Sequence, residues 1–261
     1  MREFIEIRSD PSSYFNLVKE MVIADFKLRY QNSFLGILWS LLQPMMLFGV
    51  LLFVFSVFAR FQIENYAYHL LIGVVLWNFF SEATTSSINS LIQKSRLIKK
   101  IYFPRSAIII SSTTNSFINL LFGIVTLLFF MAFSEINLDT TLFLLLLYII
   151  ELFFITLGTS FAVSSLSAKY RDISYIWPVL LRLGFWLTPI AYSVSMIPEK
   201  YHFFIFLNPI TRVIHYSRDA LLLSKVSNLD GLLALFITTI IIVVVGFSIF
   251  SSRSLQFPEE L

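Results

Sequence analysis

Six long apolar stretches divide the chain, and within them apolar residues follow one another without the alternation of a half-buried strand. They cover residues 34–58, 66–90, 107–133, 141–168, 173–193 and 229–251. A helix needs about 20 such residues to cross the hydrocarbon core of a bilayer. A membrane β-barrel would show short alternating segments instead. The pattern therefore predicts an all-α integral membrane protein with six transmembrane helices.

The amino-acid composition supports the prediction of a membrane protein. The chain is 57% hydrophobic and 13% charged, whereas soluble domains are roughly 45–50% apolar and 25% charged. Residues 1–33 carry five basic and five acidic residues and lack the apolar run of a signal peptide. We expect two parts: a cytoplasmic segment over residues 1–33, and a single six-helix transmembrane domain over residues 34–261.

Lysine and arginine predict the orientation, because they gather on the cytoplasmic side of membrane proteins. Thirteen of them fall before the first span, after the second and fourth spans, and after the sixth. Five fall on the opposite side, and Arg182 lies within the fifth span. Both termini are thus predicted to be cytoplasmic, and the long 194–228 segment is predicted to face outward.

Several function classes are disfavoured. The chain has no phosphate-loop motif, so any ATP hydrolysis belongs to another chain. It has no cysteine, and its three histidines (residues 69, 202 and 215) form no convincing catalytic set. We therefore expect no enzyme activity, no metal site, no cofactor in this chain and no nucleic-acid partner.

The segment before the first span is predicted to form an amphipathic helix. It begins at Asp10-Pro11, where the aspartate can cap free N–H groups and proline suits the first helical turn. Apolar residues then recur at helical spacing, and Asp25 and Arg29 are placed to pair. The predicted interface residues are Tyr14, Val18, Val22, Phe26 and Arg29. A plain membrane-surface anchor would show the same periodicity.

A basic stretch follows the second span. Residues 90–100 form a short amphipathic element, with apolar side chains available to lipid or a partner groove and the cations outward. The candidate coupling residues are Leu91, Ile92, Lys94, Ser95, Arg96, Leu97, Lys99 and Lys100. Attraction to anionic lipid headgroups, worth about 1 kcal/mol per basic residue, would explain the charges alone.

Three charged residues lie inside spans: Glu82, Glu151 and Arg182. Each costs roughly 3 kcal/mol at the bilayer centre, so each is expected to face the bundle interior. Arg182 could pair with either glutamate as a structural salt bridge, or the three could line a permeation path. At the start of the fifth span Asp172 can cap the helix, while Arg171 stays among the headgroups.

The outward segment 194–228 is too apolar for a simple loop. Asn208-Pro209 is a cap-and-start pair for a helix that runs to about Leu223. A re-entrant helical hairpin fits, provided that its backbone is buried in protein. An interfacial aromatic belt is the alternative. The predicted outer-gate residues are Phe203, Phe204, Asn208 and Pro209.

Aromatic residues make up 17% of the chain. Such rings stack on sugars, although lipid-facing surfaces tolerate them equally well. The channel and entrance candidates are Tyr30, Trp39, Trp77, Arg171, Asp172, Tyr175, Trp177, Arg182, Trp186 and Tyr192.

Four motifs together carry a family resemblance. They are DFKLRY at residues 25–30 followed by Gly36, Trp39 and Gln43-Pro44; IYFPR at 101–105; YRDISYIWP at 170–178 followed by FWLTPI at 185–190; and LNP at 207–209. In this order and spacing they resemble the ABC-2 type permeases that export polysaccharides, nearest to the exporters of O-antigen and of polyol-phosphate polysaccharides.

The resemblance implies a mechanism. Two copies of the chain would form a channel at their interface, lined by the first and fifth spans. Two copies of a separate ABC ATPase, which binds ATP and Mg²⁺, would drive it through the 91–100 helix and the N-terminal helix. A lipid-pyrophosphate-linked glycan would enter from the inner leaflet near Arg171 and Asp172.

The expected location is the bacterial cytoplasmic (inner) membrane, among membrane lipids. Export of teichoic acid, capsule or a small molecule stays open as an alternative. A secondary transporter is less favoured, because the spans hold few titratable groups.

Overall fold

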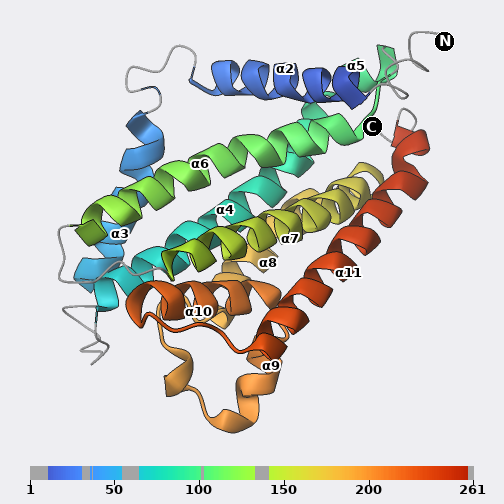
Figure 1. The fold of residues 1–261 in the computed structure, drawn as a ribbon. Coiled ribbons are helices and arrows are strands. Elements are labelled where there is room, and N and C mark those ends of the chain that lie inside the picture. The colour runs from blue at the N-terminus through green and yellow to red at the C-terminus, as the bar shows by residue number, and fades with distance from the viewer. Residues whose placement is uncertain are drawn as a thin grey trace.

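The computed structural model describes residues 11–30, 36, 38–54, 65–100, 103–132 and 141–257, and these are helical with no strand among them (Figure 1). The helices are α2 (Pro11–Tyr30), α3 (Leu38–Val54), α4 (Tyr66–Gln93), α5 (Ser95–Lys100), α6 (Ser106–Ala132), α7 (Leu142–Lys169), α8 (Ile173–Leu187), α9 (His202–Phe206), α10 (Pro209–Leu222) and α11 (Leu229–Arg253). Short 3₁₀ turns are η2 (Val194–Met196), η3 (Glu199–Tyr201) and η4 (Ser254–Gln256).

The apolar stretches of the sequence correspond to long helices. Three of these are long and apolar enough to cross a membrane: Ser106–Ala132, Leu142–Lys169 and Leu229–Gln256. Helix α8 is apolar but shorter, and α4 has 28 residues with many polar positions. The all-helical class is confirmed, and three of the six expected spans are candidate membrane spans by length and composition, with helix bounds close to those expected.

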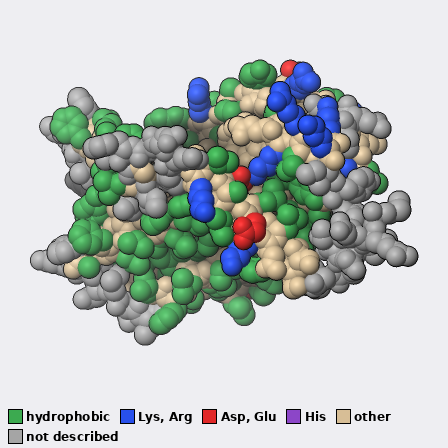
Figure 2. Space-filling model, turned by 90° about the horizontal axis from the view of Figure 1, so that it is seen from above, with side chains coloured by type: hydrophobic (Ala, Val, Ile, Leu, Met, Phe, Trp, Pro, Cys, Tyr) green, Lys and Arg blue, Asp and Glu red, His purple; other side chains and the backbone are tan. Residues whose placement is uncertain are grey.

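One face of the molecule carries α2, α5 and the end of α11. A buried apolar cluster joins these elements, and Leu17 and Met21 of α2 pack against it. Its members include Leu91, Ile98, Phe103, Phe250 and Phe257. Figure 2 looks onto the side of α2 and shows many Lys and Arg side chains there. The two ends of the described chain therefore lie on one face, as the predicted topology requires.

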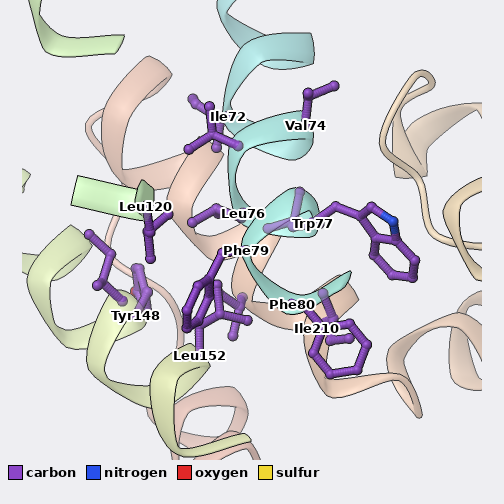
Figure 3. Packing of buried hydrophobic residues seen from close by; sticks show 14 of the residues in the cluster. Ile72, Val74, Leu76, Trp77, Phe79, Phe80, Leu120, Tyr148, Leu152 and Ile210 are labelled. Atoms are coloured by element: carbon purple, nitrogen blue, oxygen red, sulfur yellow. The ribbon is translucent and has the colours of Figure 1, made fainter. Parts of the chain in front are cut away.

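Helix α4 lies at the centre of the main core. Figure 3 shows Leu76 and Phe79 of α4 directed toward Leu120 of α6 and toward Tyr148 and Leu152 of α7. On another face of α4, Trp77 packs edge-on against Phe185 of α8, with ring centroids 6.3 Å apart. Helix α4 thus holds α6, α7 and α8 around itself.

Helix α8 ends six residues before the sequence pattern predicts. It stops at Leu187, and Thr188 takes an extended conformation with φ −84° and ψ 133°. The cause is Pro189, because a residue before proline is driven out of the helical region. The expected span to residue 193 is therefore wrong at its C-terminal end. Residues 188–191 are nevertheless buried.

Helices α7 and α11 cross at two glycines. A Cβ on Gly158 would lie 2.7 Å from the carbonyl oxygen of Ile242, and one on Gly246 would overlap the carbonyl of Gly158. Small residues at such crossings let the two backbones approach closely.

We expect Gly246→Ala to force the two helices apart and to lower stability by roughly 1–3 kcal/mol, the usual cost of overpacking. The melting temperature of the purified protein in detergent measures this. Gly49→Ala in α3 is the matched control, since nothing lies within 4 Å of its added Cβ. Equal melting temperatures for the two variants would contradict the close packing of α7 against α11 at Gly246.

Candidate functional site

Helix α2 packs lengthwise against α6 instead of standing apart. The predicted interface residues Tyr14, Val18, Val22 and Phe26 are all half-buried. The hydroxyls of Tyr14 and Ser106, the first residue of α6, are hydrogen-bonded at 3.0 Å. Burial raises the pKa of the Tyr14 phenol, which therefore stays protonated.

Two ion pairs join α2 to α4 and its C-cap residue. Lys94 Nζ donates to Asp25 Oδ2 at 2.6 Å, and Arg29 pairs with Glu82 Oε1 at 2.6 Å. The local Asp25–Arg29 pair expected from their spacing is not formed, because each finds a partner from a distant part of the chain.

The basic stretch is divided between two helices. Residues 91–93 complete α4, Lys94 caps it, and α5 begins at Ser95. Leu91 and Ile98 face the buried cluster, while Ile92 and Leu97 are exposed. Arg96, Lys99 and Lys100 are also exposed. The expectation that all cations point outward is wrong for Lys94, which turns to Asp25.

A groove of about 900 Å³ lies between α2, α3, α4 and α6. Its wall on α4 is polar at successive turns, through Asn78, Glu82, Ser86, Asn89 and Gln93. Helix α6 contributes Ser112, Asn115 and Asn119, and α3 contributes Trp39 and Gln43. Asn119 Nδ2 donates to Glu82 Oε1 at 2.8 Å. This groove was not predicted from the sequence, although polar residues recur at helical spacing along residues 78–93.

Arg218 of α10 is 4% exposed and binds three backbone carbonyls. Its Nε donates to His69 at 2.9 Å, and its two terminal nitrogens donate to Pro189 at 2.6 Å and Ile190 at 2.7 Å. A Cβ on Gly73 would lie 2.5 Å from this guanidinium, so glycine makes room for it. From the sequence alone, Arg218 was predicted to be one of five basic residues on the outer side, and its burial was not predicted.

A signal for the burial of Arg218 was present in the sequence. Ile210, Ile214 and Arg218 are four residues apart and therefore share one face of α10, and this face is buried. The guanidinium joins the start of α4, the chain after α8, and α10.

Comparisons with known proteins identify the family. The model of the ABC-2 type transporter family matches residues 16–222, most of the chain. The chain belongs to the ABC-2 type transporter family.

Individual relatives cover nearly the whole length. An O-antigen export system permease protein RfbA of Klebsiella pneumoniae is 32% identical over 259 residues, which is 98% of this chain and 99% of the relative. The RfbA of Myxococcus xanthus is 25% identical over 95% of this chain and 96% of its own. The polysialic acid transport protein KpsM of Escherichia coli is 20% identical over 90% and 93%.

Membership makes this chain the transmembrane component of an ABC transporter, a multi-pass membrane permease without a nucleotide-binding site of its own. An ABC ATPase partner is implied by the family.

The candidate residues of α8 lie in different environments. Tyr175, 78% exposed, Trp186 and Arg182 are exposed along the helix, and Arg171 is exposed before its start. Trp177 instead turns inward, and its Nε1 donates to Thr84 of α4 at 2.9 Å. Tyr192 donates its hydroxyl to the carbonyl of Trp186 at 3.0 Å.

Other aromatic candidates differ in the same way. Trp77 is buried, and its ring fills the space that Gly184 leaves on α8. Trp39 is half exposed at the groove. Tyr30 ends α2, and its side chain lies outside what the structure describes.

Two local expectations at charged residues are wrong. Asp172 occupies the N-cap position of α8, but its side chain makes no capping hydrogen bond, because the residue itself is already helical with φ −60° and ψ −28°. Arg182 pairs with neither glutamate: in the described chain Glu82 is bound by Arg29, and Glu151 is buried in α7 with its Oε2 unpartnered.

Segment 194–228 contains the expected helix. Asn208 caps α10 by accepting from the N–H of Ile210 at 3.0 Å, and its Nδ2 donates to Thr188 Oγ1 at 3.0 Å. Pro209 is the first residue of α10. Phe203 and Phe204 of α9 are exposed.

We expect Arg218→Gln to leave buried carbonyls without donors, at a cost of about 1–3 kcal/mol for each one. The variant protein should melt earlier in detergent and be recovered in lower yield. Arg182→Gln is the matched control, because Arg182 is exposed and forms no ion pair within the described residues. Arg218→Lys should be intermediate. A melting temperature for Arg218→Gln equal to that of the control would show that these three hydrogen bonds of Arg218 do not stabilise the protein.

Proposed function

We propose that this chain is the permease of an O-antigen export system, which moves a lipid-linked polysaccharide across the bacterial cytoplasmic membrane. The observation that carries the proposal is the 32% identity to RfbA of Klebsiella pneumoniae over 98% of the chain. Identity at this level over nearly the full length of both chains supports a common substrate class as well as a common fold.

The proposed topology has six transmembrane helices: α3, α4, α6, α7, α8 and α11. Both termini are cytoplasmic, so the face with α2 and α5 meets the cytoplasm. The clustering of Lys and Arg in these elements supports this orientation (Figure 2). Residues 1–33 form the N-terminal segment, and residues 34–261 the transmembrane domain.

The proposed transporter is a homodimer with two ATPase subunits. A closed two-fold dimer is the commonest oligomer, and the ATPase holds ATP and Mg²⁺. The exposed row on α8 that includes Tyr175 and Trp186, together with Trp39 of α3, supplies aromatic rings for a channel between the subunits. A lipid-pyrophosphate-linked glycan would enter beside Arg171 and Asp172.

Coupling to ATP hydrolysis is assigned to α5 and α2. Ile92 and Leu97 are exposed beside cations, which suits docking into an ATPase cleft, and Leu91 and Ile98 anchor this element to the core. The Asp25–Lys94 pair would carry the motion of α5 to α2.

The segment from η2 to α10 is proposed as a re-entrant hairpin that gates the outer mouth. The burial of one face of α10 and the exposure of Phe203 and Phe204 support this role. Asn208 and Pro209 fix the turn between the two helices.

Capsule export is the second candidate, since KpsM of Escherichia coli, a polysialic acid transport protein, matches 90% of this chain. Teichoic acid and small molecules are weaker alternatives. Deletion of the gene in its own bacterium, followed by analysis of the envelope glycans, tests all of these. We expect one surface polysaccharide to disappear and its lipid-linked form to accumulate inside. If deletion of the gene left all surface glycans unchanged, the proposed function would be wrong.

We expect Leu97→Asp to weaken recovery of the ATPase with the tagged permease by about tenfold, because a buried leucine contact is worth about 1.5–3 kcal/mol. Quantitative mass spectrometry of the purified complex measures this. Leu223→Asp is the control, an equally drastic change at an exposed leucine that caps the C-terminal end of α10, away from α2 and α5 in Figure 1. The same ATPase recovery from both variants would contradict docking at α5.

Charge reversal tests the link between α2 and the residue that caps α4. Lys94→Asp places two acids side by side, so we expect less surface polysaccharide per ATP hydrolysed. Adding Asp25→Lys restores an opposite-charge pair, worth about 1 kcal/mol or less at this exposure. Transport by the double variant should exceed that of both single variants. If it does not, the pair has no part in coupling.

A further inference from the structure

We propose that the polar groove between α2, α3, α4 and α6 is a binding site in each subunit for the uncharged, hydroxyl-rich part of the exported glycan. Asn115 of α6 is its central contact. The inference rests on the proposed function and deepens it, because it assigns a glycan site away from α8.

The groove is polar where a membrane helix would usually be apolar. Asn78, Glu82, Ser86, Asn89 and Gln93 recur at three- and four-residue intervals, so they form a stripe along one face of α4. Polar groups inside a membrane are costly, and they are kept where they line a pathway or a wet cavity. The stripe extends over more than half of α4.

Asn115 lines the groove, and its side-chain amide has no hydrogen-bond partner among the described residues. Its side chain is 7% exposed and lines the groove, yet neither its Nδ2 nor its Oδ1 has a partner among the described residues. A buried amide without partners destabilises a protein. Once this side chain turns its amide into the groove, two neighbouring hydroxyls of a sugar satisfy both atoms at once, since one donates to Oδ1 while the other accepts from Nδ2.

The charges in the groove favour a neutral ligand. Its two cations, Arg29 and Lys94, are each held by a carboxylate at 2.6 Å, from Glu82 and Asp25. The lining therefore carries no net charge, and it suits a polyhydroxyl chain better than a phosphate.

Size and aromatic lining fit the same ligand. The volume of about 900 Å³ is at the upper end of ordinary small-molecule sites and suits several linked sugars. Trp39, half exposed, offers a ring face on which a sugar can stack. Leu28 of α2 and Leu47 of α3, both exposed, add an apolar surface for the C–H faces of the sugar rings.

The test uses the intact permease–ATPase complex in nanodiscs. The probe is the strain's own surface polysaccharide, released by mild acid and therefore free of lipid and pyrophosphate. Binding is measured by thermophoresis, with inorganic pyrophosphate as a second probe. We expect wild type to bind the polysaccharide, and Asn115→Leu to bind it about tenfold more weakly, as the loss of one good polar contact predicts. Asn16→Leu on the exposed side of α2 is the matched control.

A stability measurement separates binding from folding. Because Leu removes an unpartnered amide from a buried position, Asn115→Leu should melt no earlier than wild type while it loses affinity. A purely structural asparagine would show the reverse, earlier melting with unchanged affinity, and this would overturn the site.

A label confirms the location. The chain has no cysteine, so Asn89→Cys provides a single thiol in the groove, and the polysaccharide should slow its reaction with a maleimide. Leu255→Cys should react at the same rate with and without the polysaccharide.

Failure of this site is distinguishable from failure of the proposed function. If deletion of the gene abolishes a surface polysaccharide but that polysaccharide neither binds nor protects Asn89→Cys, the groove proposal alone is wrong. Binding of pyrophosphate in place of the polysaccharide, lost in Asn115→Leu, would also overturn it, because it would make the groove an anion site.

Discussion

The structure depends on hydrogen bonding of backbone groups that the membrane cannot solvate. Pro189 ends α8 at Leu187, yet the chain that follows stays buried, so its carbonyls need donors from elsewhere. Arg218 supplies them and also binds the carbonyl of His69. One side chain thereby makes the end of α8 tolerable at a buried position and joins α4, α8 and α10. A movement of α10 must therefore be shared by the end of α8 or must break these hydrogen bonds.

Helix α4 both packs in the hydrophobic core and lines the polar groove. One apolar face packs against α6 and α7 through side chains such as Phe79, and another packs against α8 through Trp77 (Figure 3). A third face is polar and forms a wall of the groove. The ion pairs from α2 lie at this polar side, so α2, the α4–α5 junction and the groove are directly connected. This arrangement places the proposed coupling element beside the proposed glycan site.

Local sequence features predicted the helices well, because the length of an apolar run and the position of Asn or Pro act within a few residues. Asn208 and Pro209 start α10 as expected. The errors occurred where local rules compete. Pro189 shortened α8 against an apolar pattern that continued to residue 193, and Asp172 lies at a cap position without capping because its backbone is already helical.

The sequence alone was sufficient for the helical class, three candidate membrane spans and the family, since these depend on composition, helix length and ordered motifs. Only the tertiary structure decided which charges pair, which arginine is buried and where the groove lies. Lys94 meets Asp25 across 69 residues of chain, and Arg218 meets His69 across 149. Sequence spacing cannot report such contacts, because the packing of whole helices brings these groups within hydrogen-bonding distance.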